Sequence, residues 1–151
     1  MTVPESQFVY RDELPPVPRV LCVDDDPFVL AGLQRTLHTK FDVHIARTPL
    51  DALKIVDESA ASPFAVIVSD LAMPGVNGIA LLKRVREIAP DTVRVLLTGH
   101  ANVDSAIGAV NDGAVFRFLT KPCGASALTG AVAAAAEHYR LTLAERVLLE
   151  K

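Results

Sequence analysis

The stretch Val20-Leu21-Cys22-Val23-Asp24-Asp25-Asp26-Pro27 joins a short apolar run to three acids and a proline. Four consecutive apolar residues are typical of a strand that is buried on both faces. Asp26 followed by Pro27 is typical of a helix start, because a carboxylate can cap the helix and proline needs no hydrogen-bond partner at the first position. The stretch therefore predicts a buried strand, an acidic junction and then a helix.

The same alternation of strand and helix continues along the chain. Short apolar runs separated by helical patterns predict a parallel sheet with helices on both faces, which is an α/β, doubly wound fold with five strands. The expected strands are Val20–Val23, Val43–Ala46, Phe64–Val68, Val93–Leu97 and Val115–Leu119. The expected helices are Pro27–Thr39, Pro49–Ala60, Ile79–Ala89, Val103–Asn111 and a last one from about Ser126 onward.

The composition excludes several classes of protein. With 151 residues, 50% hydrophobic residues and a net charge of −3, the chain can bury a core and does not have the composition of a disordered protein. Fifteen basic against 18 acidic residues provide no excess positive charge for nucleic acid. The longest apolar runs are too short to cross a membrane, and the first residues have no signal-peptide pattern. We therefore expect a cytoplasmic protein.

Polar residues stand where the expected strands end. In a doubly wound sheet the reactive crevice lies beyond the carboxyl ends of the strands. The residues at these ends are Asp24, Asp25, Ser69, Asp70, Thr98, Thr120 and Lys121. Crowded carboxylates are hard oxygen ligands that suit Mg²⁺, and a carboxylate can act as a nucleophile toward a phosphoryl group. Asp70 stands at the end of the central strand and is the candidate nucleophile.

Four motifs, taken together and in order, resemble the receiver domain of two-component response regulators, a CheY-like module. The resemblance covers about residues 19–138 and implies the flavodoxin-like strand order 2-1-3-4-5. The motifs are Val23-Asp24-Asp25-Asp26-Pro27, Val68-Ser69-Asp70-Leu71-Ala72-Met73-Pro74-Gly75-Val76-Asn77-Gly78, Leu97-Thr98-Gly99-His100 and Phe118-Leu119-Thr120-Lys121-Pro122.

The resemblance implies a role for each matched residue. It implies that Asp70 accepts a phosphoryl group from a histidine kinase or phosphotransfer protein. It also implies that Mg²⁺ is held by Asp25, Asp70 and the backbone carbonyl of Ala72, with Asp24 acting through water. Lys121 and Thr98 would contact the phosphoryl group, Phe118 matches the aromatic switch position, and the Lys121–Pro122 bond would be cis.

Three of the matched positions would affect how this chain switches and how long it keeps the phosphoryl group. Phe118 has no hydroxyl, so its coupling to the site would rest on packing. Ala72 and His100 match the positions that flank the phosphoryl group in the family and tune its lifetime. We expect His100 to have the larger influence, because alanine has no side chain that could position or block a water molecule.

The sequence divides into three segments. Residues 1–18 are rich in proline and are expected to form a flexible leader, and residues 19–138 form the receiver domain. Residues 139–151 extend the last helix, which predicts either a link to an output domain beyond residue 151, for which an HD-type phosphodiesterase is the candidate, or a helix that packs a homodimer. No enzymatic activity is expected beyond phosphorylation and dephosphorylation of the chain itself.

Two other functions use similar residues. A haloacid dehalogenase-type phosphohydrolase also uses an aspartyl phosphate, but it needs a further acidic pair after the lysine, and here only scattered glutamates follow Lys121. A degenerate receiver that acts only as a binding module would lack the acceptor, an acid or the lysine. All three are present in this chain.

Overall fold

The computed structural model describes residues 17–150. Most of the expected leader of residues 1–18 lies outside the described residues. Pro18 already belongs to the fold, because its backbone oxygen accepts a hydrogen bond of 2.9 Å from the Asp42 nitrogen. No helix in residues 17–150 is both long and apolar enough to span a membrane.

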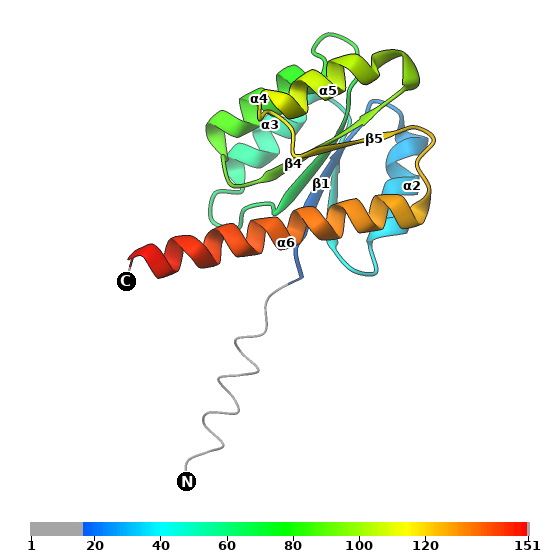
Figure 1. Ribbon diagram of the computed structural model, residues 1–151. Helices are drawn as coiled ribbons and strands as arrows, with labels where there is room; N and C mark the ends of the chain where they lie inside the picture. The colour runs from blue at the N-terminus through cyan, green and yellow to red at the C-terminus, as the bar shows by residue number, and fades with distance from the viewer. Residues whose placement is uncertain (1–16, 151) are drawn as a thin grey trace.

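Five parallel strands form one sheet in the order β2-β1-β3-β4-β5 (Figure 1). The predicted fold class and strand order are therefore confirmed. The central strands β1, β3 and β4 carry nearly continuous buried apolar residues, as expected for strands covered on both sides. The strands are β1 Arg19–Val23, β2 Asp42–Ala46, β3 Val66–Asp70, β4 Val93–Thr98 and β5 Arg117–Thr120.

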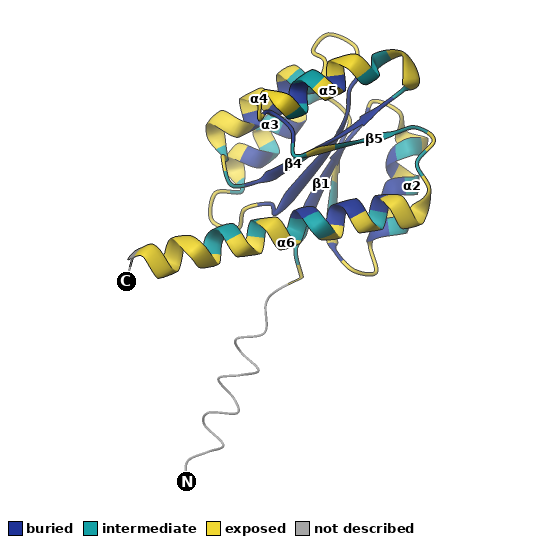
Figure 2. Ribbon diagram, in the orientation of Figure 1, coloured by how far each residue is buried: buried dark blue, intermediate teal, exposed yellow. Residues whose placement is uncertain are grey.

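The helices cover both faces of the sheet (Figures 1 and 2). On one face, α2 and α6 bury an apolar cluster that includes Leu30, Leu37 and Val132. On the other face, α3, α4 and α5 bury a second cluster that includes Phe64, Leu82 and Ala106. The helices are α2 Pro27–Leu37, α3 Pro49–Glu58, α4 Gly78–Ile88, α5 Val103–Asn111 and α6 Ala125–Glu150.

The predicted helix starts have a clear local cause. Asp26 accepts a hydrogen bond of 2.9 Å from the Phe28 nitrogen, and Pro27 is the first residue of α2. Asn77 caps α4 in the same way, because its side chain accepts a bond of 2.9 Å from the Ala80 nitrogen. These side chains satisfy backbone donors that a helix start leaves unpaired.

A few element boundaries differ from the predicted ones. Val115 precedes β5 because its backbone nitrogen donates to the Ala109 oxygen and so closes the end of α5. A short 3₁₀ helix, η1 (His100–Asn102), follows β4 where the sequence indicated only a loop. Helix α2 ends at Leu37 rather than Thr39, and a turn follows it.

Candidate functional site

The parallel sheet brings the polar strand ends to one edge. Asp70 is the last residue of β3 and Thr98 is the last residue of β4, while Asp24 follows β1 and Lys121 follows β5. The register pairs Asp70 with Leu97 and Thr98 with Thr120, so the strands end at nearly the same level. This is the arrangement predicted from the strand ends.

Lys121 joins the two buried carboxylates. Its Nζ lies 2.8 Å from Asp70 Oδ1 and 3.2 Å from Asp24 Oδ2. Residues Asp24 and Asp70 are only 1% and 6% exposed, whereas the lysine side chain is one third exposed. A buried carboxylate needs a partner to remain charged, and here one ammonium group serves two of them.

The pKa shifts follow from this arrangement. Burial raises the pKa of Asp24, the Asp26 backbone N–H opposes this rise, and the charge of Asp70 adds to it. For Lys121, burial alone would lower the pKa, but the hydrogen bond to Asp70 and the charges of both acids outweigh burial and raise it. The lysine therefore stays positively charged beside the acids.

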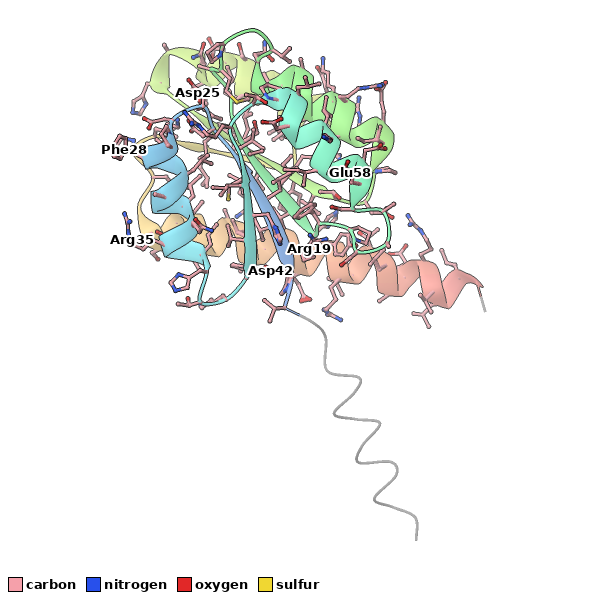
Figure 3. All side chains as sticks on the ribbon, turned by 180° about the vertical axis from the view of Figure 1, so that it is seen from behind. Arg19, Asp25, Phe28, Arg35, Asp42 and Glu58 are labelled. Atoms are coloured by element: carbon pink, nitrogen blue, oxygen red, sulfur yellow. The ribbon has the colours of Figure 1, made fainter. Side chains whose placement is uncertain are left out.

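Asp25 completes an acidic cluster that fits a divalent cation. One carboxylate oxygen each from Asp24, Asp25 and Asp70 can lie within 4.8 Å of the others. Asp25 is exposed at the end of β1, next to the start of α2 (Figure 3). Within residues 17–150, these three carboxylates face the single ammonium group of Lys121, which leaves a local excess of negative charge. Their hard oxygen atoms are the ligand type that Mg²⁺ prefers.

Asp24 is also held by its own loop. Its Oδ1 accepts a hydrogen bond of 2.9 Å from the Asp26 nitrogen, and its Oδ2 faces Lys121. Both of its oxygen atoms therefore have protein partners, whereas Asp25 is open to solvent. The two neighbouring acids therefore have different environments.

The expected switch positions lie on β4, which pairs with the strand of Asp70, and on β5, which lies beyond β4. Thr98 is buried, and its hydroxyl donates to the Gly99 oxygen at 3.1 Å. Its backbone oxygen accepts a bond of 2.8 Å from the Lys121 nitrogen, which fixes the start of the loop after β5. The Lys121–Pro122 peptide bond in this loop is cis. Phe118 is half-buried and packs against the core under α3, α4 and α5.

Ala72 and His100 are both exposed on the loops after β3 and β4. His100 is the first residue of η1. Ala72 has no polar side-chain atom, and within the described residues the His100 imidazole forms no hydrogen bond to the three acids. Both positions are therefore open to a molecule that approaches this edge of the sheet.

Gly78 is a residue of the site for which the matched motif implied no role. A Cβ atom on Gly78 would lie 2.1 Å from the backbone oxygen of Asp70, so no other residue fits without a shift. Its nitrogen donates a hydrogen bond of 2.7 Å to the Leu71 oxygen. The signal in the sequence is a glycine directly after Asn77, a residue typical of a helix cap.

A comparison with protein families identifies the family of this chain. A model of the response regulator receiver domain matches residues 20–133. The chain belongs to this family. A receiver domain is the phosphoacceptor module of two-component signalling, so the function read from the strand ends is confirmed at the level of the family.

Similar proteins support the assignment of this receiver domain. The C4-dicarboxylate transport transcriptional regulatory protein DctD of Pseudomonas aeruginosa is 36% identical over 131 residues, which are 86% of this chain and 28% of DctD. A structure from Rhodopirellula baltica, described as an adenylate cyclase, has 38% identity and a TM-score of 0.86 over 90% of this chain and 99% of that one. The signal receiver domain of an HD domain-containing protein from Pseudomonas fluorescens has 30% identity and a TM-score of 0.77 over 85% of this chain and 93% of that one.

The chain spans about a quarter of the length of the curated relatives that it matches. The match to the receiver domain family does not favour the alternative of a haloacid dehalogenase-type phosphohydrolase. The degenerate receiver is also not favoured, because Asp70, the two neighbouring acids and Lys121 lie together.

Proposed function

We propose that this receiver domain accepts a phosphoryl group on Asp70. The observation that carries the proposal is the contact of 2.8 Å between Lys121 Nζ and Asp70 Oδ1 at the end of the central strand. The contact places a fixed positive charge beside a buried carboxylate that has two acidic neighbours, Asp24 and Asp25.

The transfer requires one bond to form and one to break. An Asp70 carboxylate oxygen attacks phosphorus, and the bond from phosphorus to the leaving group breaks, with its electron pair remaining on the leaving group. For a phosphohistidine donor that leaving group is the imidazole nitrogen. Negative charge on the phosphoryl oxygens has to be balanced during the transfer, and Lys121 lies where it can contribute to this balance.

The acidic cluster is the proposed Mg²⁺ site. Asp25 and Asp70 would be the direct carboxylate ligands, the Ala72 backbone carbonyl would be a third ligand, and Asp24 would act through water. The difference between the acids supports this division, since both oxygen atoms of Asp24 already have protein partners and Asp25 is exposed. Bound Mg²⁺ supplies positive charge toward the phosphoryl oxygens.

Thr98 and Phe118 are the proposed switch residues. The Thr98 hydroxyl donates to the neighbouring Gly99 oxygen, a local bond that it can exchange for a phosphoryl oxygen. Phe118 lies on β5, next to β4, and packs against the apolar cluster under α3, α4 and α5, so its movement would follow a change in the loop after β4. The coupling rests on packing, because Phe118 has no hydroxyl.

Acetyl phosphate with and without Mg²⁺ tests the acceptor. We expect covalent phosphate on the parent protein only when Mg²⁺ is present, and none on Asp70→Asn. Asp104→Asn is the matched control, because Asp104 is an exposed carboxylate in the first turn of α5. Equal phosphorylation of Asp70→Asn and the parent would show that the acceptor is another residue.

A histidine kinase or phosphotransfer protein is the proposed donor, and the cytoplasm is the proposed location. The only activities that we propose for this chain are its own phosphorylation and dephosphorylation. An output domain is the further proposed partner, because the curated relatives are much longer than the matched region. The HD-type phosphodiesterase has support from one similar structure, the receiver of an HD domain-containing protein, whereas the DctD relatives are transcriptional regulatory proteins.

A further inference from the structure

Strand β2 lies at one end of the sheet, and within residues 17–150 no strand pairs with its outer edge. We propose that the segment Gln7-Phe8-Val9-Tyr10-Arg11 of this chain, which lies outside the described residues, binds this edge as an antiparallel strand. The support comes from the edge itself, from the place where the chain leaves the sheet and from the pattern of the segment. The pairing does not depend on phosphorylation of Asp70.

The outer edge of β2 presents backbone hydrogen-bonding groups. The Asp42 nitrogen donates to the residue before β1, and the Ala46 oxygen accepts from the residue after β1, so both turn their backbone groups toward β1. Because successive residues of a strand alternate in direction, Val43 and Ile45 turn their N–H and C=O groups outward. A row of such groups on an edge strand is a template for a further strand.

The outer edge of β2 also has exposed apolar side chains. Ile45 is 41% exposed, and Val43 is half-buried against the cluster under α2 and α6. The register pairs them with Cys22 and Val20 of β1, which belong to that cluster, so both lie on the face of the sheet under α2 and α6. Apolar side chains of an added strand would cover them on this face.

The chain leaves the described structure beside the start of β2. Pro18 accepts a hydrogen bond of 2.9 Å from the Asp42 nitrogen, so it already lies next to this strand. Residues 12–16 then connect the segment to Val17. They have to cross two strand spacings, about 10 Å, and five residues can span about 16–18 Å. The connection is long enough only when the segment runs antiparallel to β2, because its last residue then lies at the end where the chain enters β1.

The segment has the composition of a strand. Phe8 and Tyr10 are aromatic and Val9 is β-branched, which are the residue types that favour strands. The prolines that predict a flexible leader lie outside the segment, at positions 4, 15, 16 and 18. Proline lacks the N–H group that a paired strand donates, so the part of the leader that can pair is residues 5–14.

One register pairs the backbone and the apolar groups together. It places Tyr10 opposite Val43, so that each donates and accepts a hydrogen bond through its backbone. Phe8 then lies opposite Ile45 in the same way. Directly opposed residues share a face of the sheet, so both aromatic rings cover the exposed apolar side chains of β2. A shift of one residue would turn the rings to the other face.

The same register brings opposite charges together at the start of β2. Arg11 lies opposite Asp42, whose side chain is 54% exposed. Figure 3 shows Asp42 near Arg19, and its Oδ2 lies 3.7 Å from Arg19 Nε. Its Oδ1 lies 3.2 Å from His44 Nε2. Asp42 is still open to solvent beside these partners, and opposite charges in directly opposed positions favour strand pairing.

Amide hydrogen exchange of the full chain tests the pairing. We expect Tyr10→Pro to make the N–H groups of Val43 and Ile45 exchange at least tenfold faster, because proline cannot donate to β2. Val9→Pro is the matched control, since the N–H group of Val9 would face away from β2. The N–H group of His44 faces β1 and should exchange slowly in all three proteins. Equal exchange of Val43 and Ile45 in the parent and Tyr10→Pro overturns the pairing, and equal acceleration by both prolines overturns the register.

A disulfide tests the register and the origin of the added strand. In a Cys123→Ser background, Val9→Cys with His44→Cys should form a disulfide within one chain, because these positions are directly opposed and their side chains lie close together. Tyr10→Cys with His44→Cys is the control and should not, since these side chains would lie on opposite faces of the sheet. A disulfide that joins two chains, or equal yields from the two pairs, overturns the proposal.

Discussion

The position of a Cβ atom on Gly78 lies 2.1 Å from the backbone oxygen of Asp70. Gly78 is the first residue of α4, and Asp70 is the last residue of β3. The hydrogen bond from the Gly78 nitrogen to Leu71 draws the helix start against the strand end. Gly78 is therefore a positioning residue, because only glycine allows the backbone of Asp70, the proposed acceptor, to occupy its present place.

Gly78→Ala should displace Asp70 and reduce phosphorylation by acetyl phosphate. A shift of about 1 Å at a reacting group can lower a rate by about 100-fold, and we expect a loss of this order. Mg²⁺ affinity, measured by calorimetry, should fall as well, because Asp70 is also a proposed ligand. The rate and the affinity are both measured at a temperature at which the variant is folded.

Gly108→Ala is the control for a general effect of replacing glycine. Gly108 lies within α5, and a Cβ atom there would have no neighbour within 4 Å. Alanine favours a helix interior over glycine by about 1 kcal/mol, so this variant should be as stable as the parent or more stable. Normal phosphorylation of Gly78→Ala would contradict the positioning role.

Asp25→Ala should weaken Mg²⁺ binding more than Asp24→Ala does. Loss of a residue that acts through another group costs about 10–100-fold in affinity, and loss of a direct ligand should exceed this range. Asp24 is expected to be the indirect one because its oxygens bind the Asp26 nitrogen and Lys121. Calorimetric titration of both variants with Mg²⁺ gives the ratio, and equal losses would remove the distinction.

The sequence predicted the site because parallel strands bring their carboxyl ends to one edge. Asp70, Thr98 and Lys121 each follow an apolar run, so their proximity depends only on the fold class. The different burial of Asp24 and Asp25 could not be predicted, because it depends on which acid turns toward Lys121. Asp91 and Arg146 are 55 positions apart in the sequence. Their ion pair could not be predicted, because exposed charged residues follow no periodic pattern that identifies their partners.

Lys121→Ala should still be phosphorylated on Asp70, because bound Mg²⁺ would supply much of the positive charge that the transfer needs, but it should lose the conformational response. Phosphorylation adds about 1.5 to 2 negative charges, which the ammonium group detects directly. Thr98→Ala should show the same defect, because it removes the second contact to the phosphoryl group. Amide exchange with and without beryllofluoride measures the response over residues 103–119. A response equal to that of the parent in both variants would exclude this relay.

His100→Ala should change the rate at which phosphate is lost from Asp70 and leave Mg²⁺ affinity nearly unchanged. The imidazole is exposed at the start of η1, where it can orient or block an approaching water molecule. Asn102→Ala is the control, since Asn102 belongs to the same short helix and makes no capping bond. A time course of phosphate release compares the three proteins, and identical curves would leave His100 without a role in the lifetime.

Arg146→Ala should raise the pKa of Asp91. In the folded parent the hydrogen bond and charge of Arg146 lower this pKa below its ordinary value, although partial burial opposes the shift. NMR titration of the Asp91 carboxyl group measures the change directly. Arg84→Ala is the control, because Arg84 pairs with Glu87 and should leave Asp91 unaffected.

The lowered pKa of Asp91 also fixes the pH range in which this pair stabilises the fold. The contribution is fully present above the unfolded pKa of about 3.9 and is lost as the pH falls through the lower, folded value. For a partly exposed pair the contribution is about 0.2–1 kcal/mol, so parent and Arg146→Ala should differ by this amount in free energy of unfolding at pH 7. The difference should persist at pH 5 and shrink below about pH 4. A difference that stays constant down to pH 3 would mean that Arg146 acts through packing of its side chain on α6 rather than through the Asp91 carboxylate.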